Sequence, residues 1–274
     1  MNPRESFASL RKLADGVTNS PLGGLVTDLR VAICFYTTLP LPAPTATIAA
    51  SDGTALARAS WCVPLVGALI GAIAALAYWV AIRLNLPPVV AATLAVGAGM
   101  LTTGCLHEDG LADTADGFGG ETRERRLEIM RDGRIGAFGA CALVMAIALR
   151  VGALADLPNP ELVAWALVGA HAAARAGLPL FMRLVPPARV DGLSAAAGAP
   201  PLGRAVAALA IGVAVLAIAL GVDNALITVA LLLAAGIVMA WLCRRRIGGQ
   251  TGDTLGALEQ VWECLVLLVT AARF

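Results

Sequence analysis

Long apolar runs separated by shorter polar connections dominate the pattern of this chain. An α-helix needs roughly 20 apolar residues to cross the hydrocarbon core of a bilayer, and each run is about that long. The runs predict seven transmembrane helices, at about 61–82, 88–106, 135–155, 161–182, 205–222, 224–243 and 255–272. With 58% hydrophobic and 14% charged residues, the composition is that of a membrane protein and not of a soluble one. We therefore expect an all-α, polytopic integral membrane helical bundle.

The N-terminal part of the chain does not fit the pattern of a spanning helix. The apolar run at 31–45 is short and interrupted by Pro40, Pro42 and Pro44, so we expect a re-entrant or interfacial element there. Residues 1–30 place charges and a Pro-Leu-Gly-Gly string ahead of that run, which is not the order of a secretory signal. We predict a cytoplasmic extension over 1–30 and, because no repeat divides the remainder, a single transmembrane catalytic domain over 31–274.

Basic residues are concentrated in alternate connections. Most of the 20 Lys and Arg residues precede the first run or lie between the second and third, fourth and fifth, or sixth and seventh runs, whereas the opposite side keeps only Arg83 and Arg273. By the positive-inside rule the arginine-rich side is cytoplasmic, and the C-terminus is outside if the last run crosses fully. The long connections 107–134 and 183–204 lie on this side, so the candidate chemistry faces the cytoplasm. The net charge of +1 does not indicate a nucleic-acid partner.

The most specific feature is an acidic block behind the second run, at 107–120, which reads His-Glu-Asp-Gly-Leu-Ala-Asp-Thr-Ala-Asp-Gly-Phe-Gly-Gly. On a helix, Asp109, Asp113 and Asp116 stand at i, i+4 and i+7 and share one face. Three such carboxylates repel one another unless a cation lies among them, and oxygen ligands favour Mg²⁺, which recruits substrate phosphates to complete its shell. The block therefore predicts a metal-assisted enzyme, with Asp113 and Asp116 counted as catalytic as well as metal-binding.

Next to the block, His107 is a candidate general base, since the pKa of histidine lies near neutrality. A hydrogen bond that orients Asp109 and a direct metal contact are the alternatives.

A second cytoplasmic segment offers phosphate ligands. Arg131 and Arg134 flank Asp132, a combination suited to holding phosphate oxygens while a further carboxylate faces the metal. A solvated loop rich in positive charge explains the same residues equally well.

The string Gly-Gly-Gln-Thr-Gly-Asp at 248–253 provides a third candidate segment. Backbone amides around Gly249 and Thr251 could approach a phosphate just before a helix, and Asp253 would add a metal ligand. A plain turn is the alternative.

Two ionisable residues lie inside the fourth run. His171 and Arg175 are one helical turn apart, so both face the same way, and the cost of a charge in lipid turns Arg175 toward the bundle interior. Both are candidate substrate-binding residues; a structural ion pair of Arg175 with Glu259 or Glu263 is the alternative.

Four motifs together resemble a known family. These are the block at 107–117, Glu-Ile-Met-Arg-Asp-Gly-Arg-Ile-Gly-Ala-Phe-Gly at 128–139, Gly-Gly-Gln-Thr-Gly-Asp-Thr-Leu-Gly-Ala at 248–257 and Phe-Tyr-Thr-Thr-Leu-Pro at 35–40. The chain is similar to the cobalamin synthase family (adenosylcobinamide-GDP ribazoletransferase) over roughly 24–270. Family members often have arginine where this chain has Thr38, so no phosphate contact is assigned there.

The resemblance implies the last step in assembling the nucleotide loop of vitamin B12. A hydroxyl of α-ribazole, or of its 5′-phosphate, would attack the cobinamide-bound phosphorus of adenosylcobinamide-GDP and release GMP. It also implies Mg²⁺ as cofactor and the bacterial inner membrane as location. Small residues on the runs, such as Gly67 and Gly71, would permit close helix packing and leave a homo-oligomer possible.

Two other functions fit the sequence less well. A CDP-alcohol phosphotransferase also sets aspartates on a membrane helix, but its usual pattern carries a second half that this chain lacks. A cation transporter would place its acids near the bilayer midplane, whereas these acids cluster at one membrane face.

Overall fold

The computed structural model describes residues 21–41 and 54–273. Within these ranges the chain is helical, apart from connections and one isolated bridge between Pro187 and Gln250. The helices are α2 (Pro21–Tyr36), α3 (Thr54–Ala59), α4 (Val63–Arg83), α5 (Pro88–Thr103), α6 (Leu106–Phe118), α7 (Arg123–Ile129), α8 (Ala137–Ala155), α9 (Pro160–Ala176), α10 (Leu178–Leu184), α11 (Leu193–Ala197), α12 (Leu202–Leu220), α13 (Val222–Ile247) and α14 (Gly252–Arg273). The prediction of an all-α membrane protein is confirmed.

Five helical stretches of the described ranges are long and apolar enough to cross a membrane, and α5 with α6 forms a sixth if the two are taken as one bent span. The five are Ala55–Arg83, Ala137–Ala155, Leu202–Leu220, Val222–Ile247 and Gly252–Ala272. The fourth predicted span, 161–182, is instead divided at Gly177 into α9 and α10. Pro179 lies in the first turn of α10 and has no N–H to continue the helix, and a Cβ on Gly177 would lie 2.6 Å from the indole of Trp262. The described residues thus hold five or six candidate spans, where the sequence predicts about seven.

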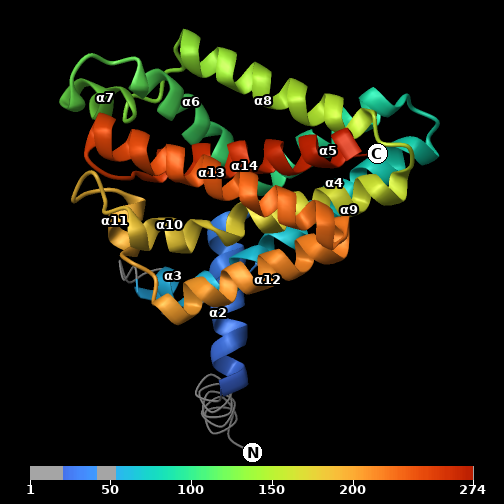
Figure 1. The fold of residues 1–274 in the computed structure, drawn as a ribbon, viewed down its shortest axis with the longest axis horizontal. Coiled ribbons are helices and arrows are strands. Elements are labelled where there is room, and N and C mark those ends of the chain that lie inside the picture. The colour runs from blue at the N-terminus through green and yellow to red at the C-terminus, as the bar shows by residue number, and fades with distance from the viewer. Residues whose placement is uncertain (1–20, 42–53, 274) are drawn as a thin grey trace, which may run out of the picture.

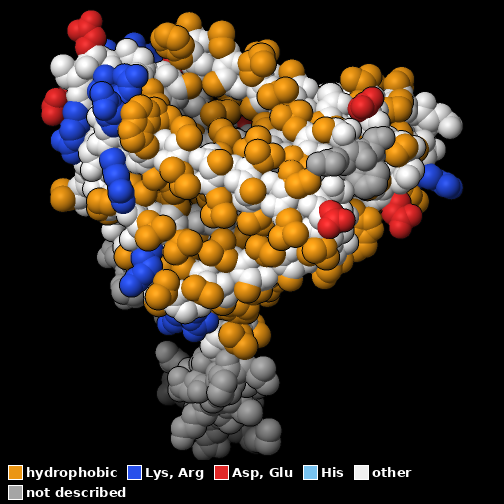
Figure 2. All heavy atoms as spheres, in the orientation of Figure 1, with side chains coloured by type: hydrophobic (Ala, Val, Ile, Leu, Met, Phe, Trp, Pro, Cys, Tyr) orange, Lys and Arg blue, Asp and Glu red, His pale blue; other side chains and the backbone are white. Residues whose placement is uncertain are grey.

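The long helices run between the same two ends of the bundle (Figure 1). α7, α11 and the turn between α13 and α14 lie at one end, and the C-terminus lies at the other. Most Lys and Arg side chains visible in Figure 2 gather at the first of these ends, which we call the arginine-rich end. The charge asymmetry expected from the sequence is thus present in three dimensions.

α14 is the central helix of the bundle. In its spanning stretch 67% of the residues are buried, against 28% in α8 and 22% in both α12 and α13. The last run, whose crossing was left open, therefore forms a helix of full spanning length that contacts mainly protein. The other three helices turn most of their surface outward, as expected of helices that face lipid.

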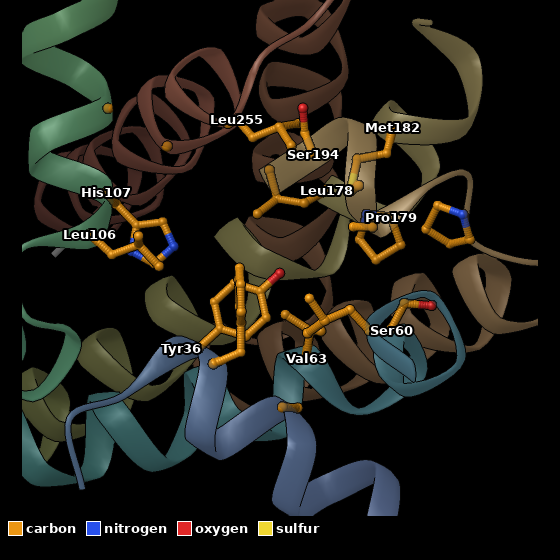
Figure 3. A pocket seen from close by; sticks show the side chains of 18 of the residues that line it. Tyr36, Ser60, Val63, Leu106, His107, Leu178, Pro179, Met182, Ser194 and Leu255 are labelled. Atoms are coloured by element: carbon orange, nitrogen blue, oxygen red, sulfur yellow. The ribbon is translucent and has the colours of Figure 1, made fainter. Parts of the chain in front are cut away.

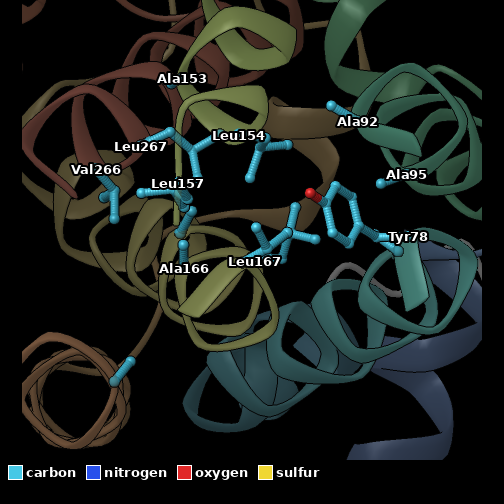
Figure 4. Close-up of a cluster of buried hydrophobic side chains, with 14 of the residues drawn as sticks. Tyr78, Ala92, Ala95, Ala153, Leu154, Leu157, Ala166, Leu167, Val266 and Leu267 are labelled. Carbon is cyan, nitrogen blue, oxygen red and sulfur yellow. The ribbon is translucent and has the colours of Figure 1, made fainter. Parts of the chain in front are cut away.

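Small residues allow the closest helix contact. A Cβ on Gly67 of α4 would lie 2.2 Å from the carbonyl oxygen of His171, and one on Gly71 would lie 2.5 Å from that of Leu167, so α4 and α9 meet backbone to backbone. Beside this contact, apolar side chains of α4, α5, α8, α9 and α14 form one cluster that includes Tyr78 and Leu154 (Figure 4).

The N-terminal element begins earlier in the chain than predicted. α2 begins at Pro21, well before the expected domain boundary at 31, and lies across the direction of the long helices (Figure 1). Asp28, which was assigned to the extension, is buried and accepts hydrogen bonds from Arg58 Nε (2.7 Å) and Trp61 Nε1 (3.1 Å). Residues 1–20 of the predicted extension lie outside the described residues.

Candidate active site at the arginine-rich end

A sharp turn separates the acidic block from the preceding span. Gly104 (φ 64°) and Cys105 (φ 58°) both adopt the left-handed conformation, which favours glycine and is uncommon for cysteine. The turn ends α5 at Thr103 and bends the chain by 91° into α6. The acidic block therefore forms a separate helix and does not continue the second span.

The three aspartates of α6 lie toward its accessible side, as the spacing predicts. Asp109 is exposed and Asp113 and Asp116 are partly exposed, whereas His107 and Glu108 are buried.

The start of α14 packs tightly against α6. A Cβ on Gly110 would lie 2.8 Å from the carbonyl oxygen of Asp253, and one on Gly256 would lie 3.2 Å from Cα of His107. Only glycine permits this backbone approach. It brings the acidic block and Asp253, which are far apart in the sequence, to one place.

The resulting cluster has an excess of negative charge. The charged groups that act on Asp113 are Asp109, Asp253, Asp116 and Arg189. Arg189 is the one cation among them, and its Nη2 lies 3.4 Å from Asp253. Within the described residues Asp109 and Asp113 form no ion pair. The geometry thus brings together three of the predicted metal ligands, Asp109, Asp113 and Asp253.

Asp116 has a structural contact that the sequence did not indicate. Its Oδ2 accepts a hydrogen bond from the backbone N–H of Gly136 (2.7 Å) and its Oδ1 accepts one from Gly139 (2.9 Å), so the carboxylate caps the N-terminus of α8. A Cβ on Gly139 would lie 2.3 Å from this carboxylate. Each oxygen accepts one hydrogen bond from the start of α8, so Asp116 is the cap of that helix, and its metal-binding and catalytic roles stay predictions.

The candidates of the 131–134 loop do not join the cluster. Arg134 donates to Asp132 from Nε (2.9 Å) and Nη2 (2.6 Å), and Arg131 pairs with Asp191. The hydrogen-bonded guanidinium of Arg134 lowers the pKa of the Asp132 carboxyl below its usual value. The other charge that acts on Asp132 is that of Arg125. The structure thus favours the solvated loop, and the expected metal contact of Asp132 is not supported.

Gly249 and Thr251 form a turn and do not face an open site. A Cβ on Gly249 would lie 2.3 Å from the carbonyl oxygen of Pro186, and Thr251 is fully buried. Thr251 and Thr254 exchange hydrogen bonds between hydroxyl and backbone N–H (2.9 and 3.2 Å) and cap the start of α14. Gly249 and Thr251 therefore belong to a plain turn, the alternative to a phosphate site. Of the 248–253 segment only Asp253 reaches the cluster.

Behind the cluster lies a buried network of charged side chains from four helices. Arg175 Nη1 lies 2.6 Å from Glu259 Oε1, and His171 Nδ1 lies 3.0 Å from Glu263 Oε2. The network consists of His107 and Glu108 of α6, Arg150 of α8, His171 and Arg175 of α9, and Glu259 and Glu263 of α14. The ion-pair alternative thus accounts for Arg175, which is 1% exposed and out of reach of a substrate phosphate.

Part of this network has the donor atoms of a metal site. Ligand atoms of His171, Glu259 and Glu263 lie within 4.8 Å of one another. However, Arg150 Nη1 is 3.2 Å from Glu263 and Arg175 is paired with Glu259, so a guanidinium group already contacts each of these two carboxylates.

A cavity of about 190 Å³ opens beside the carboxylate cluster (Figure 3). Asp109, His107 and Asp253 line one side, and the remainder is mostly apolar, with residues of α2, α3, α4, α10, α11 and α14. Tyr36, which sequence reasoning missed, lies parallel to His107 with the ring centroids 6.1 Å apart. Burial raises the pKa of Tyr36 to about 12, so its phenol stays protonated near neutral pH.

Comparison with known proteins identifies the relatives of this chain. The model of the cobalamin-5-phosphate synthase family matches residues 28–271. The chain belongs to this family. It is 56% identical to an adenosylcobinamide-GDP ribazoletransferase of Bradyrhizobium diazoefficiens, over 90% of this chain and 94% of that protein. Enzymes of the same name from Mesorhizobium japonicum (48%; 90% and 93%) and Ralstonia nicotianae (46%; 89% and 95%) are also similar. No solved structure is detectably similar.

In this member of the cobalamin-5-phosphate synthase family, the motifs that carry the resemblance meet in space. Arg123 of α7 donates to the carbonyl oxygens of Ile247 (2.8 Å) and Ala188 (2.6 Å), which ties three connections together. The acidic block meets the glycine-rich 136–139 segment through the hydrogen bonds of Asp116, and it meets the start of α14 where Gly110 approaches Asp253.

Proposed function

We propose that this protein is an adenosylcobinamide-GDP ribazoletransferase of the bacterial inner membrane, with its active site facing the cytoplasm. The observation that carries the proposal is the meeting of Asp109, Asp113 and Asp253, the first and last of which line a cavity, in a chain whose relatives bear that name. The arginine-rich end supports the cytoplasmic orientation by the positive-inside rule.

The reaction is a phosphoryl transfer. The oxygen of an α-ribazole hydroxyl, or of α-ribazole 5′-phosphate, bonds to the phosphorus that carries cobinamide. The bond from this phosphorus to the oxygen of GMP breaks, GMP leaves, and the hydroxyl proton passes to a base.

The chemistry of the donor atoms in the carboxylate cluster supports Mg²⁺. Its donors are all oxygens, at least one is exposed, and three carboxylates face a single guanidinium. Asp109, Asp113 and Asp253 would hold the ion, which would offset the charge of the diphosphate and of departing GMP. Arg189, which is already at the cluster, is placed to orient phosphate oxygens.

The hydrogen bonds of His107 argue against its role as general base. Arg175 Nη2 lies 3.3 Å from His107 Nδ1, and because arginine only donates, Nδ1 must accept. The proton of the neutral ring is then on Nε2, which makes His107 a hydrogen-bond donor. The proton acceptor would then be a carboxylate of the cluster, through an oxygen that the ion leaves free.

Turnover tests the proposal. Purified protein in liposomes is given adenosylcobinamide-GDP, α-ribazole and Mg²⁺, and corrinoid mass and GMP release are followed. We expect stoichiometric GMP, with turnover lost in EDTA and in Asp113→Asn at unchanged folding. Conversion by Asp113→Asn at the wild-type rate would refute the proposed metal site, and no conversion by folded wild-type protein would refute the proposed reaction.

A further inference from the structure

A second hollow of the protein is an apolar groove, lined by residues of α9, α10, α12, α13 and α14. Its volume is about 730 Å³, against about 190 Å³ for the cavity beside the carboxylate cluster. Among the described residues that line it, Arg244 and Arg245 are the charged ones, and the others are apolar or glycine. Two of its walls, α12 and α13, are spanning helices that turn most of their surface toward lipid.

Small residues let the helices pack closely beneath the groove, and large residues form its rim. A Cβ on Gly212 of α12 would lie 2.2 Å from Cβ of Ala176 of α9, so these two helices are in tight contact there. Leu233, Ile237 and Trp241 of α13 also line the groove, and each is more than half exposed. The groove is therefore open toward the bilayer.

The groove follows one face of α13. The lining residues of this helix recur every three or four positions from Val229 to Arg245, which is the spacing of a single helix face. At a rise of 1.5 Å per residue, this face is about 24 Å long. One leaflet accounts for half of a hydrocarbon core about 30 Å thick, so the groove is long enough for the acyl chain of a lipid.

Arg244 and Arg245 lie at the headgroup end of such a lipid. They belong to the last turn of α13, beside the turn to α14 at the arginine-rich end (Figure 1). Arg244 Nη2 donates to the carbonyl oxygen of Leu184 (2.7 Å), and Arg245 Cζ lies 5.5 Å from the ring centroid of Trp241. Both side chains are exposed, and neither pairs with a carboxylate in the part of the chain that the structure describes. Their positive charges are therefore available to an anionic ligand.

We infer that this groove binds an anionic glycerophospholipid, with one acyl chain along α13 and the phosphate held by Arg244 and Arg245. Arginine binds phosphate oxygens through several N–H donors, and basic pockets between transmembrane helices on the cytoplasmic side suit anionic headgroups. A zwitterionic lipid has the same acyl chains, but its ammonium group offsets the charge of its phosphate. The arginines thus select for net negative charge, while the apolar walls accept the chain.

The proposed substrates do not account for this groove, because α10 separates it from the carboxylate cluster. Leu178 and Met182 of α10 line the cavity beside the cluster. Leu180 and Leu184 of the same helix line the groove. At about 100° per residue, these two pairs lie on opposite faces of α10. A nucleotide bound in the groove would lie behind α10, away from the carboxylates.

The test uses full-length protein in liposomes of phosphatidylcholine with a minor fraction of phosphatidylglycerol. The acyl chains of one lipid or of the other carry bromine, and quenching of tryptophan fluorescence reports which lipid lies beside the indoles. Trp241 and Trp262 line the groove, so a brominated chain bound there quenches them. Titrating the mole fraction of phosphatidylglycerol gives its affinity relative to phosphatidylcholine.

Two matched pairs of variants distinguish the groove from the general surface. Arg245→Gln removes a charge that lines the groove, whereas Arg246→Gln removes an exposed charge at the next position, which does not line it. Ala240→Phe narrows the groove, whereas Ala234→Phe adds the same side chain at an exposed position of α13 outside it. The arginine pair leaves the packing of the groove intact, so it decides the test even if Ala240→Phe fails to fold.

We expect wild-type protein to bind phosphatidylglycerol about tenfold or more tightly than phosphatidylcholine, and Arg245→Gln to lower this preference about fivefold. Arg246→Gln should leave it nearly unchanged, and Arg244→Gln combined with Arg245→Gln should abolish it. Ala240→Phe should weaken binding of phosphatidylglycerol, and Ala234→Phe should not.

Three outcomes would overturn the inference. The first is equal quenching by the two brominated lipids in wild-type protein, and the second is an equal loss of preference in Arg245→Gln and Arg246→Gln. The third is a cross-linked dimer in the liposomes that Ala240→Phe abolishes and Ala234→Phe retains, because a second copy of the chain would then occupy the groove. Since lipid binding is measured without turnover, its result is independent of the proposed reaction.

Discussion

Replacing Arg175 with glutamine should destabilise the protein by about 3–5 kcal/mol, the cost of leaving one member of a buried ion pair uncompensated. Arg175 is 1% exposed, its Nη1 lies 2.6 Å from Glu259 Oε1, and Glu259 is 0% exposed. Without the guanidinium, the Glu259 carboxylate would have to remain charged in the interior of the bundle or take up a proton. Combining Arg175→Gln with Glu259→Gln removes both charges and should restore at least about 2 kcal/mol.

The assay is unfolding in mixed micelles by titration with sodium dodecyl sulfate, followed by tryptophan fluorescence. Arg125→Gln is the control, because Arg125 pairs with Glu128 at 2.8 Å while both side chains are more than half exposed, and its loss should cost about 1 kcal/mol or less. Arg175→Gln within about 1 kcal/mol of wild type, or additive losses in the double variant, would refute the reasoning. A raised KM with unchanged unfolding would return Arg175 to a role in binding substrate.

Three further predictions concern helix contacts. Asp116→Ala should cost about 1–2 kcal/mol in the same titration through loss of the α8 cap but keep turnover and the Mg²⁺ requirement; a raised Mg²⁺ requirement would make Asp116 a ligand after all. Gly139→Ala, whose Cβ meets Asp116 at 2.3 Å, should be less stable than Gly133→Ala, whose Cβ meets nothing within 4 Å, and equal stability would contradict the tight cap. Gly67→Ala should lower the free energy of unfolding by about 1–3 kcal/mol, because its Cβ would clash at the α4–α9 contact, whereas Gly97→Ala should not. Equal free energies of unfolding would contradict that contact.

The sequence predicts the fold well where the length of an apolar run decides whether a spanning helix forms. Apolar runs of spanning length become helices, and the bias of arginine toward one side appears as the arginine-rich end. Breaks are less predictable, since they depend on tertiary contacts. The left-handed Cys105 and the packing of Gly177 on Trp262 leave no clear pattern in an apolar run, so the end of the second span and the division of the fourth were missed.

In the candidate site, too, the sequence pattern predicts one part of the arrangement and tertiary contacts decide the other. Helical spacing places Asp109 and Asp113 on one accessible side, but spacing alone cannot show that Asp116 is already bonded to two amides of α8. Convergence of Asp253 on this side depends on the glycine contacts between α6 and α14.

The position of α14 in the chain has a consequence for biosynthesis. α14 is the least apolar of the five single spanning stretches, with a mean hydropathy of 1.5 against 2.1 to 2.6, and carries Glu259 and Glu263 in its interior-facing surface. Carboxylates are costly in lipid, so this helix enters the membrane most favourably beside Arg150 and Arg175, which are translated before it. Because α14 also brings Asp253, a nascent chain has no complete carboxylate cluster until this helix is in place. Insertion of α14 and assembly of the cluster then coincide, so we expect a variant without α14 to lack activity altogether.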